Sequence, residues 1–201
     1  MAGVASDRWV VLLRGLNVGR ANRVAMADLR DALAVAGFPG ARTYLQSGNA
    51  VVDASTAMPP DDAATRIAEA VAARTGSHVV VRVLEAAALQ HAIDNDPFPT
   101  AEERPTSLHL FFLSGSPSDD GLRRLAEVAA PTEAFASRGE LLYLHAPDGI
   151  GRSKLAASVE RFLGVTATAR NWRTVTRLSA LATDDAGPHR DHANGAFNRA
   201  R

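Results

Sequence analysis

The sequence predicts an α+β protein made of two similar halves. β-prone and helix-prone segments follow one another in the order β-α-β-β-α-β, and this order returns about 100 residues later, which indicates a duplication. The composition, with 46% hydrophobic and 22% charged residues among 201, is typical of a globular protein. The element order is that of the ferredoxin-like fold, so we expect two tandem β-α-β-β-α-β ferredoxin-like halves with an extra C-terminal helix.

The expected N-terminal half covers residues 1–94. It opens with a short apolar run, its helices end at glycines, and a Ser-Gly-Asn turn between two β-prone runs predicts a hairpin. The expected elements are a strand at Trp9–Leu13, a helix at Met26–Gly37, the hairpin around Ser47–Asn49, a helix at Pro59–Gly76, a strand at His78–Leu84 and a short helix at Glu85–Ile93.

A connector with three prolines follows at residues 95–106, and the C-terminal half with its added helix covers residues 107–183. Residues 184–201 lack apolar periodicity and are expected to be disordered. The expected elements of the second half are strands at Leu108–Leu113, Glu133–Ser137, Leu141–His145 and Val165–Ala169, and helices at Ser116–Ala129, Pro147–Gly164 and Asn171–Ala182.

Composition excludes several classes of protein. The chain has no cysteine, so disulfides and thiolate chemistry are absent, and its scattered histidines give no metal-ligand spacing; we expect no metal and no cofactor. No apolar run reaches the ~18 residues of a membrane span, and the first residues lack a signal peptide, so we expect a cytoplasmic protein without a membrane partner. The net charge of zero argues against a wholly basic nucleic-acid binder.

The charges are nevertheless unevenly distributed. No acidic residue lies between Asp7 and Asp28 or between Glu160 and Asp184, and each interval contains four arginines. Among 22 basic residues only Lys154 is a lysine. A neutral protein with such intervals can carry a locally positive site.

The first candidate segment is "LLRGLNVGRAN", which follows the first strand. Its glycines are spaced G-x-x-x-G, which matches neither the dinucleotide-binding pattern nor the P-loop. Glycine still allows a backbone to approach an anion closely, and an arginine at a strand end can grip it with two hydrogen bonds. The candidate ligand-binding residues are Arg14, Gly15, Asn17, Gly19 and Asn22. The alternative is a solvated connection.

A second candidate segment, "GIGRSKL", places Gly151, Ser153 and Lys154 at a helix start. Basic residues there oppose the helix dipole, and a bound anion would explain them; the alternative is that exposed charges are tolerated. In the "QSGN" turn, Ser47 and Asn49 are further candidates, although turn chemistry alone accounts for them.

A third candidate segment, "RNWRTVTR", contains the candidates Arg170, Asn171 and Arg173 on an amphipathic helix start. Trp172 falls on the opposite, apolar side and is expected in the core. A solvated helix face is the alternative reading of the arginine stripe. Known catalytic motifs such as G-x-S-x-G and H-E-x-x-H are absent from the sequence, so no catalytic residue is assigned.

Together the segments "LLRGLNVGRAN", "MADLRDAL", "GFPGARTYLQSGNAVV", "NDPFP", "GIGRSKL" and "TARNWRTVTRL", in this order, resemble the DUF1697 family. The resemblance extends from Trp9 to Ala182. Members of the family commonly have glycine and lysine where this chain has Arg20 and Ala21, which makes the loop here richer in arginine. The resemblance implies a duplicated ferredoxin-like protein and assigns no function.

The residues favour a module that binds a phosphate-bearing ligand, either a nucleotide or a nucleic-acid backbone, at a composite basic site. One alternative is an enzyme acting on a small anionic substrate, with Ser153 and Lys154 as polar candidates. Another is a structural protein that forms a homodimer without a ligand. Within one half we expect the 14–23 loop and the 47–49 turn at opposite edges of the sheet, so that they share a site only if the halves pack with opposite ends together.

Overall fold

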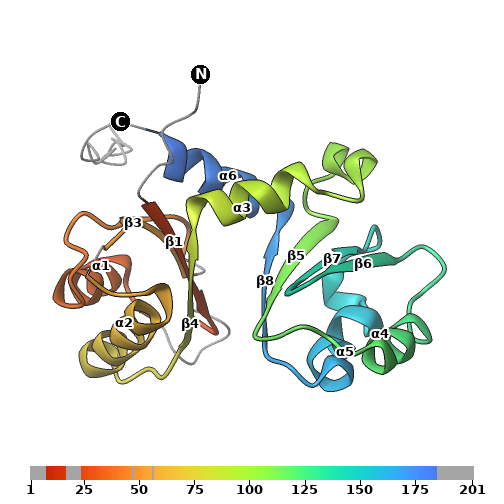
Figure 1. The fold of residues 1–201 in the computed structure, drawn as a ribbon, viewed down its shortest axis with the longest axis horizontal. Coiled ribbons are helices and arrows are strands. Elements are labelled where there is room, and N and C mark those ends of the chain that lie inside the picture. Colours follow the sequence, from red (N-terminus) through yellow and green to blue (C-terminus); the bar gives the residue numbers. More distant parts are fainter. Residues whose placement is uncertain (1–7, 17–23, 47, 56, 185–201) are drawn as a thin grey trace, which may run out of the picture.

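The computed structural model describes residues 8–16, 24–46, 48–55 and 57–184. Two four-stranded antiparallel sheets lie side by side, one in each half of the chain (Figure 1). A pair of helices covers the outer face of each sheet, and two further helices lie between the halves. No helix in the described part of the chain is long and apolar enough to cross a membrane.

The N-terminal sheet has the strand order β2-β3-β1-β4, which is the ferredoxin-like order. Its elements are β1 (Arg8–Arg14), α1 (Met26–Val35), β2 (Arg42–Thr43), β3 (Asn49–Asp53), α2 (Pro60–Thr75), β4 (Val80–Glu85) and α3 (Ala86–Asp94).

The C-terminal sheet repeats this arrangement with the order β6-β7-β5-β8. Its elements are η1 (Pro99–Glu103), β5 (Leu108–Leu113), α4 (Asp119–Ala126), β6 (Ala134–Arg138), β7 (Leu141–His145), η2 (Ile150–Arg152), α5 (Lys154–Leu163), β8 (Ala167–Asn171) and α6 (Trp172–Thr183). The predicted fold of two tandem ferredoxin-like halves is confirmed.

The repeat also includes a helix after the last strand of each half. Helix α3 follows β4 without a gap, and α6 follows β8 in the same way, so the expected extra C-terminal helix has a counterpart in the first half. These two helices pack against each other between the sheets (Figure 1). Helix α5 begins at Lys154 rather than at Pro147, because the preceding loop forms a 3-10 turn before Ser153 caps the helix.

Three clusters of buried apolar side chains fill the molecule. One lies between the N-terminal sheet and its outer helices, one lies between the C-terminal sheet and its outer helices, and the third lies between the two sheets around α3 and α6. Trp9, Val11 and Leu13 belong to the first cluster, whereas Val10 and Leu12 belong to the third. The Trp9–Leu13 part of β1 is therefore buried on both faces, which explains why this stretch is uniformly apolar instead of alternating.

The strand register brings the end of β1 next to the hairpin turn. Leu12 pairs with Asn49, and the amide of Leu13 donates to the carbonyl of Gly48 at 2.8 Å. The expectation that the 14–23 loop and the 47–49 turn begin at opposite edges of the sheet was wrong. Strands β1 and β3 are antiparallel neighbours, so the C-terminal end of β1 lies beside the N-terminal end of β3, where the hairpin enters it.

The far end of α6 is held by the N-terminal half. Arg8 donates to the carbonyl oxygens of Leu181, at 3.4 Å, and of Asp184, and Arg42 also donates to the carbonyl of Leu181. Burial, and secondarily the charge of Arg8, lowers the pKa of Arg42. Cations at a helix C-terminus satisfy its free carbonyls and its negative dipole end. The first described strand and the last described helix are thereby joined.

Candidate functional site

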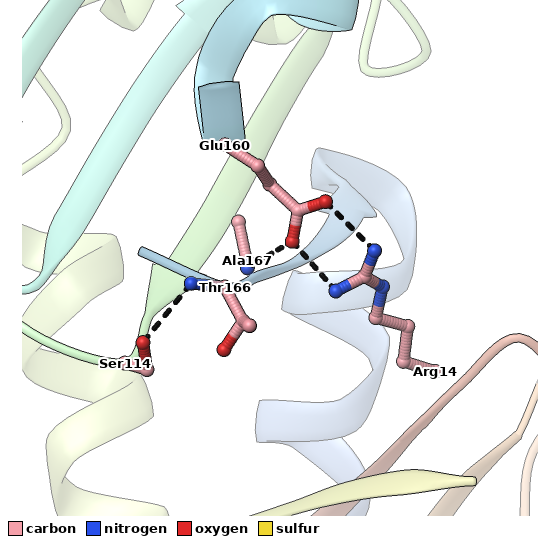
Figure 2. Close-up of polar contacts among 5 residues, drawn as sticks. All are labelled: Arg14, Ser114, Glu160, Thr166 and Ala167. Carbon is pink, nitrogen blue, oxygen red and sulfur yellow. Dashed lines mark hydrogen bonds and ion pairs between the residues drawn. The ribbon is translucent and has the colours of Figure 1, made fainter. Parts of the chain in front are cut away.

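Arg14, the expected anion grip, forms an ion pair with Glu160 of helix α5 (Figure 2). Its two terminal nitrogens donate to the two carboxylate oxygens at 2.6 and 2.8 Å. The same carboxylate accepts the amide of Ala167 at 2.7 Å, which orients it towards β8. An anion would have to compete with this carboxylate for the guanidinium of Arg14. The pair links the end of β1 in one half to α5 in the other.

Arg170 points out of β8 into the first half. Its guanidinium donates to the carbonyls of Leu13, at 2.8 Å, and Gly48, at 3.0 Å, and to the side-chain oxygen of Asn49. Burial lowers its pKa to about 10, which leaves it charged at neutral pH. Arg170 therefore holds the hairpin turn and the end of β1 against the C-terminal half.

Arg82 makes a corresponding contact in the opposite direction. It donates from β4 to the carbonyl of Leu113, at 2.7 Å, and to the carboxylate of Glu140, at 2.7 Å. Leu113 occupies the position in the C-terminal half that Leu13 occupies in the N-terminal half. The amide of Leu113 donates to the carbonyl of Glu140 at 2.8 Å, as the amide of Leu13 donates to that of Gly48. Each half thus sends an arginine from its last strand to the end of the other half's first strand. Arg82, Glu140 and Glu160 are not among the candidates predicted from the sequence, because no local pattern reveals such distant partners.

The remaining hairpin and loop candidates are placed only in part. Asn49 is fully buried, and its side-chain amide donates to the carbonyl of Tyr44 at 3.0 Å, so it closes the hairpin. Gly15 has a positive φ of 79°, and no atom of the described residues lies within 4 Å of the position that a Cβ would take there. Asn17, Gly19, Asn22 and Ser47 lie outside the described residues.

Two of the polar candidates cap helices. The side chain of Ser153 accepts the amide of Ala156 at 2.9 Å at the start of α5, and that of Asn171 accepts the amide of Thr174 at 2.9 Å at the start of α6. Serine and asparagine are favoured at this position for this contact. Trp172, predicted to lie in the core, is buried in the central cluster.

Lys154 and Gly151 are exposed near the first turn of α5. Glu160 is six residues further along the same helix, so at ~1.5 Å per residue the ion pair with Arg14 lies about 9 Å away along the axis. The candidate segments therefore form two separate groups. Arg14, Arg170 and Asn49 lie at the junction of the halves, and "GIGRSKL" lies with the start of α6.

A cavity of about 280 Å³ opens where this second group meets. It lies between the segment that follows η1, the loop that follows β7, and the first turn of α6. Its walls are formed by Glu103, Arg104, Pro105, Thr106, Ser107, Ala146, Pro147, Gly149 and Arg173. The backbone ties these segments together, because Ala146 donates to the carbonyl of Ser107 at 2.8 Å and Arg173 to that of Pro105 at 3.4 Å.

Two positive side chains reach this cavity. Arg104 and Arg173 are both exposed, and neither forms an ion pair with any residue that the structure describes. The first turn of α6 adds the positive end of a helix dipole. Glu103 contributes a carboxylate to the same wall. The two guanidinium groups can bind an oxyanion of a ligand, and the carboxylate of Glu103 can accept hydrogen bonds from another group of that ligand.

A buried histidine lies close to this region. His109 of β5 is 7% exposed, pairs in register with Asn171, and has no hydrogen-bond partner for its Nδ1 among the described residues. Burial lowers its pKa to about 4, and a hydrogen bond to the backbone of Ser107 opposes this only in part. His109 is therefore neutral at pH 7 and adds no charge to the cavity.

Within the ranges that the structure describes, no cluster of three or more histidine, aspartate or glutamate side chains could hold a metal ion. The features are those of a duplicated ferredoxin-like protein with an arginine-lined cavity beside one helix start.

Comparison with known proteins identifies the family. The model of a family described as a protein of unknown function (DUF1697) matches residues 7–143, and the chain belongs to this family. The fold is similar to that of the conserved bacterial protein SP0830 from Streptococcus pneumoniae, with a TM-score of 0.62 and 19% sequence identity over 87% of this chain and 98% of that one. No curated protein matches the sequence.

Proposed function

We propose that this protein binds a small phosphate-bearing ligand in the cavity between η1, β7 and α6. The observation that carries the proposal is the pair of exposed arginines, Arg104 and Arg173, which face one cavity without a carboxylate partner among the described residues. Guanidinium groups bind phosphate with paired hydrogen bonds, and exposed cations around a concave site raise the local concentration of anions.

The proposed site does not include every residue of the composite basic site that the sequence predicts. The guanidinium groups of Arg14 and Arg170 are engaged with Glu160 and with backbone carbonyls, where they join the two halves. Arg173 retains the role expected from the sequence, and Gly149 of the "GIGRSKL" segment lines the same cavity.

The shape of the site favours a small ligand over a polymer. A cavity of about 280 Å³ is near the lower end of the ~300–1,000 Å³ range of small-molecule sites. A nucleic-acid backbone would instead require an extended groove with several phosphate contacts.

We also propose a cytoplasmic location, because the chain contains no cysteine and therefore no disulfide of the kind common in secreted proteins.

Titration of inorganic phosphate and ribose 5-phosphate, followed by calorimetry and thermal unfolding at low salt, tests the proposal. We expect binding that weakens with added salt and is reduced ~10-fold or more in Arg104→Gln and Arg173→Gln, because charge-assisted hydrogen bonds are lost. Arg66→Gln, which removes an exposed arginine on α2, is the matched control and should bind normally. Absence of binding by the unmodified protein, or equal loss in the control, would overturn the proposal.

A further inference from the structure

We infer that the ligand is a nucleoside monophosphate whose base lies against Phe98 and His145, outside the cavity that holds its phosphate. This inference rests on the proposed function. It uses a pair of aromatic rings, Phe98 and His145, that the phosphate site does not include.

The cavity lies at the small end of the range of ligand sites. Its volume of about 280 Å³ suits a phosphate with its sugar, whereas sites that enclose drug-sized ligands extend to several times that volume. If a ligand places its phosphate beside Arg104 and Arg173, any further ring must lie beyond the cavity wall.

An aromatic pair includes a residue that adjoins the cavity lining in the chain. The rings of Phe98 and His145 have centroids 6.3 Å apart and an angle of 32° between their planes. Both side chains are only partly buried, so each retains some access to solvent. His145 directly precedes Ala146, which lines the cavity. Aromatic rings in such a setting are platforms on which bases stack.

Helix η1 sets the distance between the two features. Phe98 precedes its first residue and Arg104 follows its last. At the ~2 Å rise per residue of a 3-10 helix, their backbones are about 12 Å apart. A phosphate, a sugar and a base laid end to end along η1 fit such a separation.

Two residues that line the cavity offer groups for the sugar. Glu103 has a carboxylate that accepts hydrogen bonds from hydroxyls, and Thr106 has a hydroxyl that donates or accepts. Both residues are exposed. The residues in and beside this cavity thus include cations, polar groups and aromatic rings, the three kinds of group that bind the phosphate, the sugar and the base of a nucleotide.

A purely structural role for the rings makes a different prediction. Phe98 packs partly against the central apolar cluster, so shortening it could lower stability without any effect on ligands. The measurement must therefore separate the contribution of the base from that of the phosphate.

Calorimetric titration of AMP, ribose 5-phosphate and inorganic phosphate makes that separation. We expect AMP to bind at least ~5-fold more tightly than ribose 5-phosphate, as stacking of one base provides. Phe98→Leu and His145→Ala should each reduce this ratio while leaving the affinity for ribose 5-phosphate unchanged, and Phe98→Tyr should preserve it. Thermal unfolding identifies any variant that fails to fold, and the remaining variants then carry the test.

The outcomes separate the two proposals. If no phosphate compound binds, the proposed function fails and this inference fails with it. If AMP and ribose 5-phosphate bind equally, or if the folded ring variants leave their ratio unchanged, the phosphate site stands and the base site is overturned.

Discussion

His109 is an ionisable side chain on β5, held almost out of water between its sheet neighbours Leu144 and Asn171. The protonated imidazole would lose most of its hydration there, so burial favours the neutral ring and lowers the pKa from 6.5 to about 4. Between these two values the unfolded chain binds a proton that the folded protein does not. Stability therefore rises with pH across this interval and is lost as the pH falls from 6.5 towards 4.

Replacement of His109 by glutamine should remove this part of the pH dependence. We expect the unfolding free energy of the unmodified protein to fall by up to about 3 kcal/mol more than that of His109→Gln between pH 7 and pH 4. Urea unfolding at several pH values measures the difference, in which the shared titration of carboxylates cancels. His78→Gln, at an exposed position, is the control and should parallel the unmodified protein. Parallel curves for His109→Gln as well would contradict the assignment.

Single residues show what local sequence can and cannot predict. Ser153 and Asn171 were predicted to bind a ligand from segments at helix starts, and the structure shows each capping its helix through a contact that spans only three residues. The partners of Arg14 and Arg170 are more than 100 residues away in the chain, so the sequence indicated a local positive charge but not its neutralisation. The sequence predicts which helix or strand carries an arginine. The packing of the two halves determines whether its guanidinium faces a ligand or a carboxylate.

At the scale of elements, the β2–β3 hairpin depends on one glycine. Gly48 has a φ of 78°, and a Cβ there would lie 2.8 Å from the carbonyl oxygen of Leu13. The hairpin passes so closely over the end of β1 that a side chain has no space. The pattern "SGN" predicted a turn, but the close approach follows from the strand register, which no local pattern fixes.

Gly48→Ala tests this close approach, with Gly15→Ala as a matched control. Both glycines have nearly the same positive φ, 78° and 79°, but at Gly15 no atom in the described part of the chain lies within 4 Å of the position of an added Cβ. Gly15→Ala should therefore cost only the backbone strain, about 1–2 kcal/mol, and Gly48→Ala should cost clearly more. Chemical unfolding measures both. Equal losses would show that the contact with β1 is relieved without cost.

At the scale of the whole molecule, arginines join two halves that each have their own core. The Arg14–Glu160 pair is half-exposed, with 38% and 41% of the two side chains accessible, so solvent screens it and its contribution is modest. Arg170 is more deeply buried and donates to backbone groups of the other half. The general architecture was predictable because each half carries its own pattern of strands and helices, whereas the junction depends on which ends of the sheets meet.

A double-mutant cycle with Arg14→Gln and Glu160→Gln measures the coupling across the junction. We expect an interaction energy of about 0.5–1 kcal/mol at low salt that decreases as salt is added, because the pair is partly exposed. The Arg74–Asp31 pair, at 2.7 Å and within the N-terminal half, provides the comparison. An interaction energy of zero at low salt would show that the two halves gain nothing from this contact.

The contact between Arg8 and the end of α6 has a consequence for chain connectivity. Because Arg8 reaches the carbonyl of Asp184, the first described strand and the last described helix meet in space. The two ends of the described chain therefore lie close together. Each sheet would keep its strands if the second repeat came first in the sequence. A circularly permuted chain, opened in the exposed turn after α4 and joined from Asp184 to Arg8, would preserve every strand pairing of both sheets.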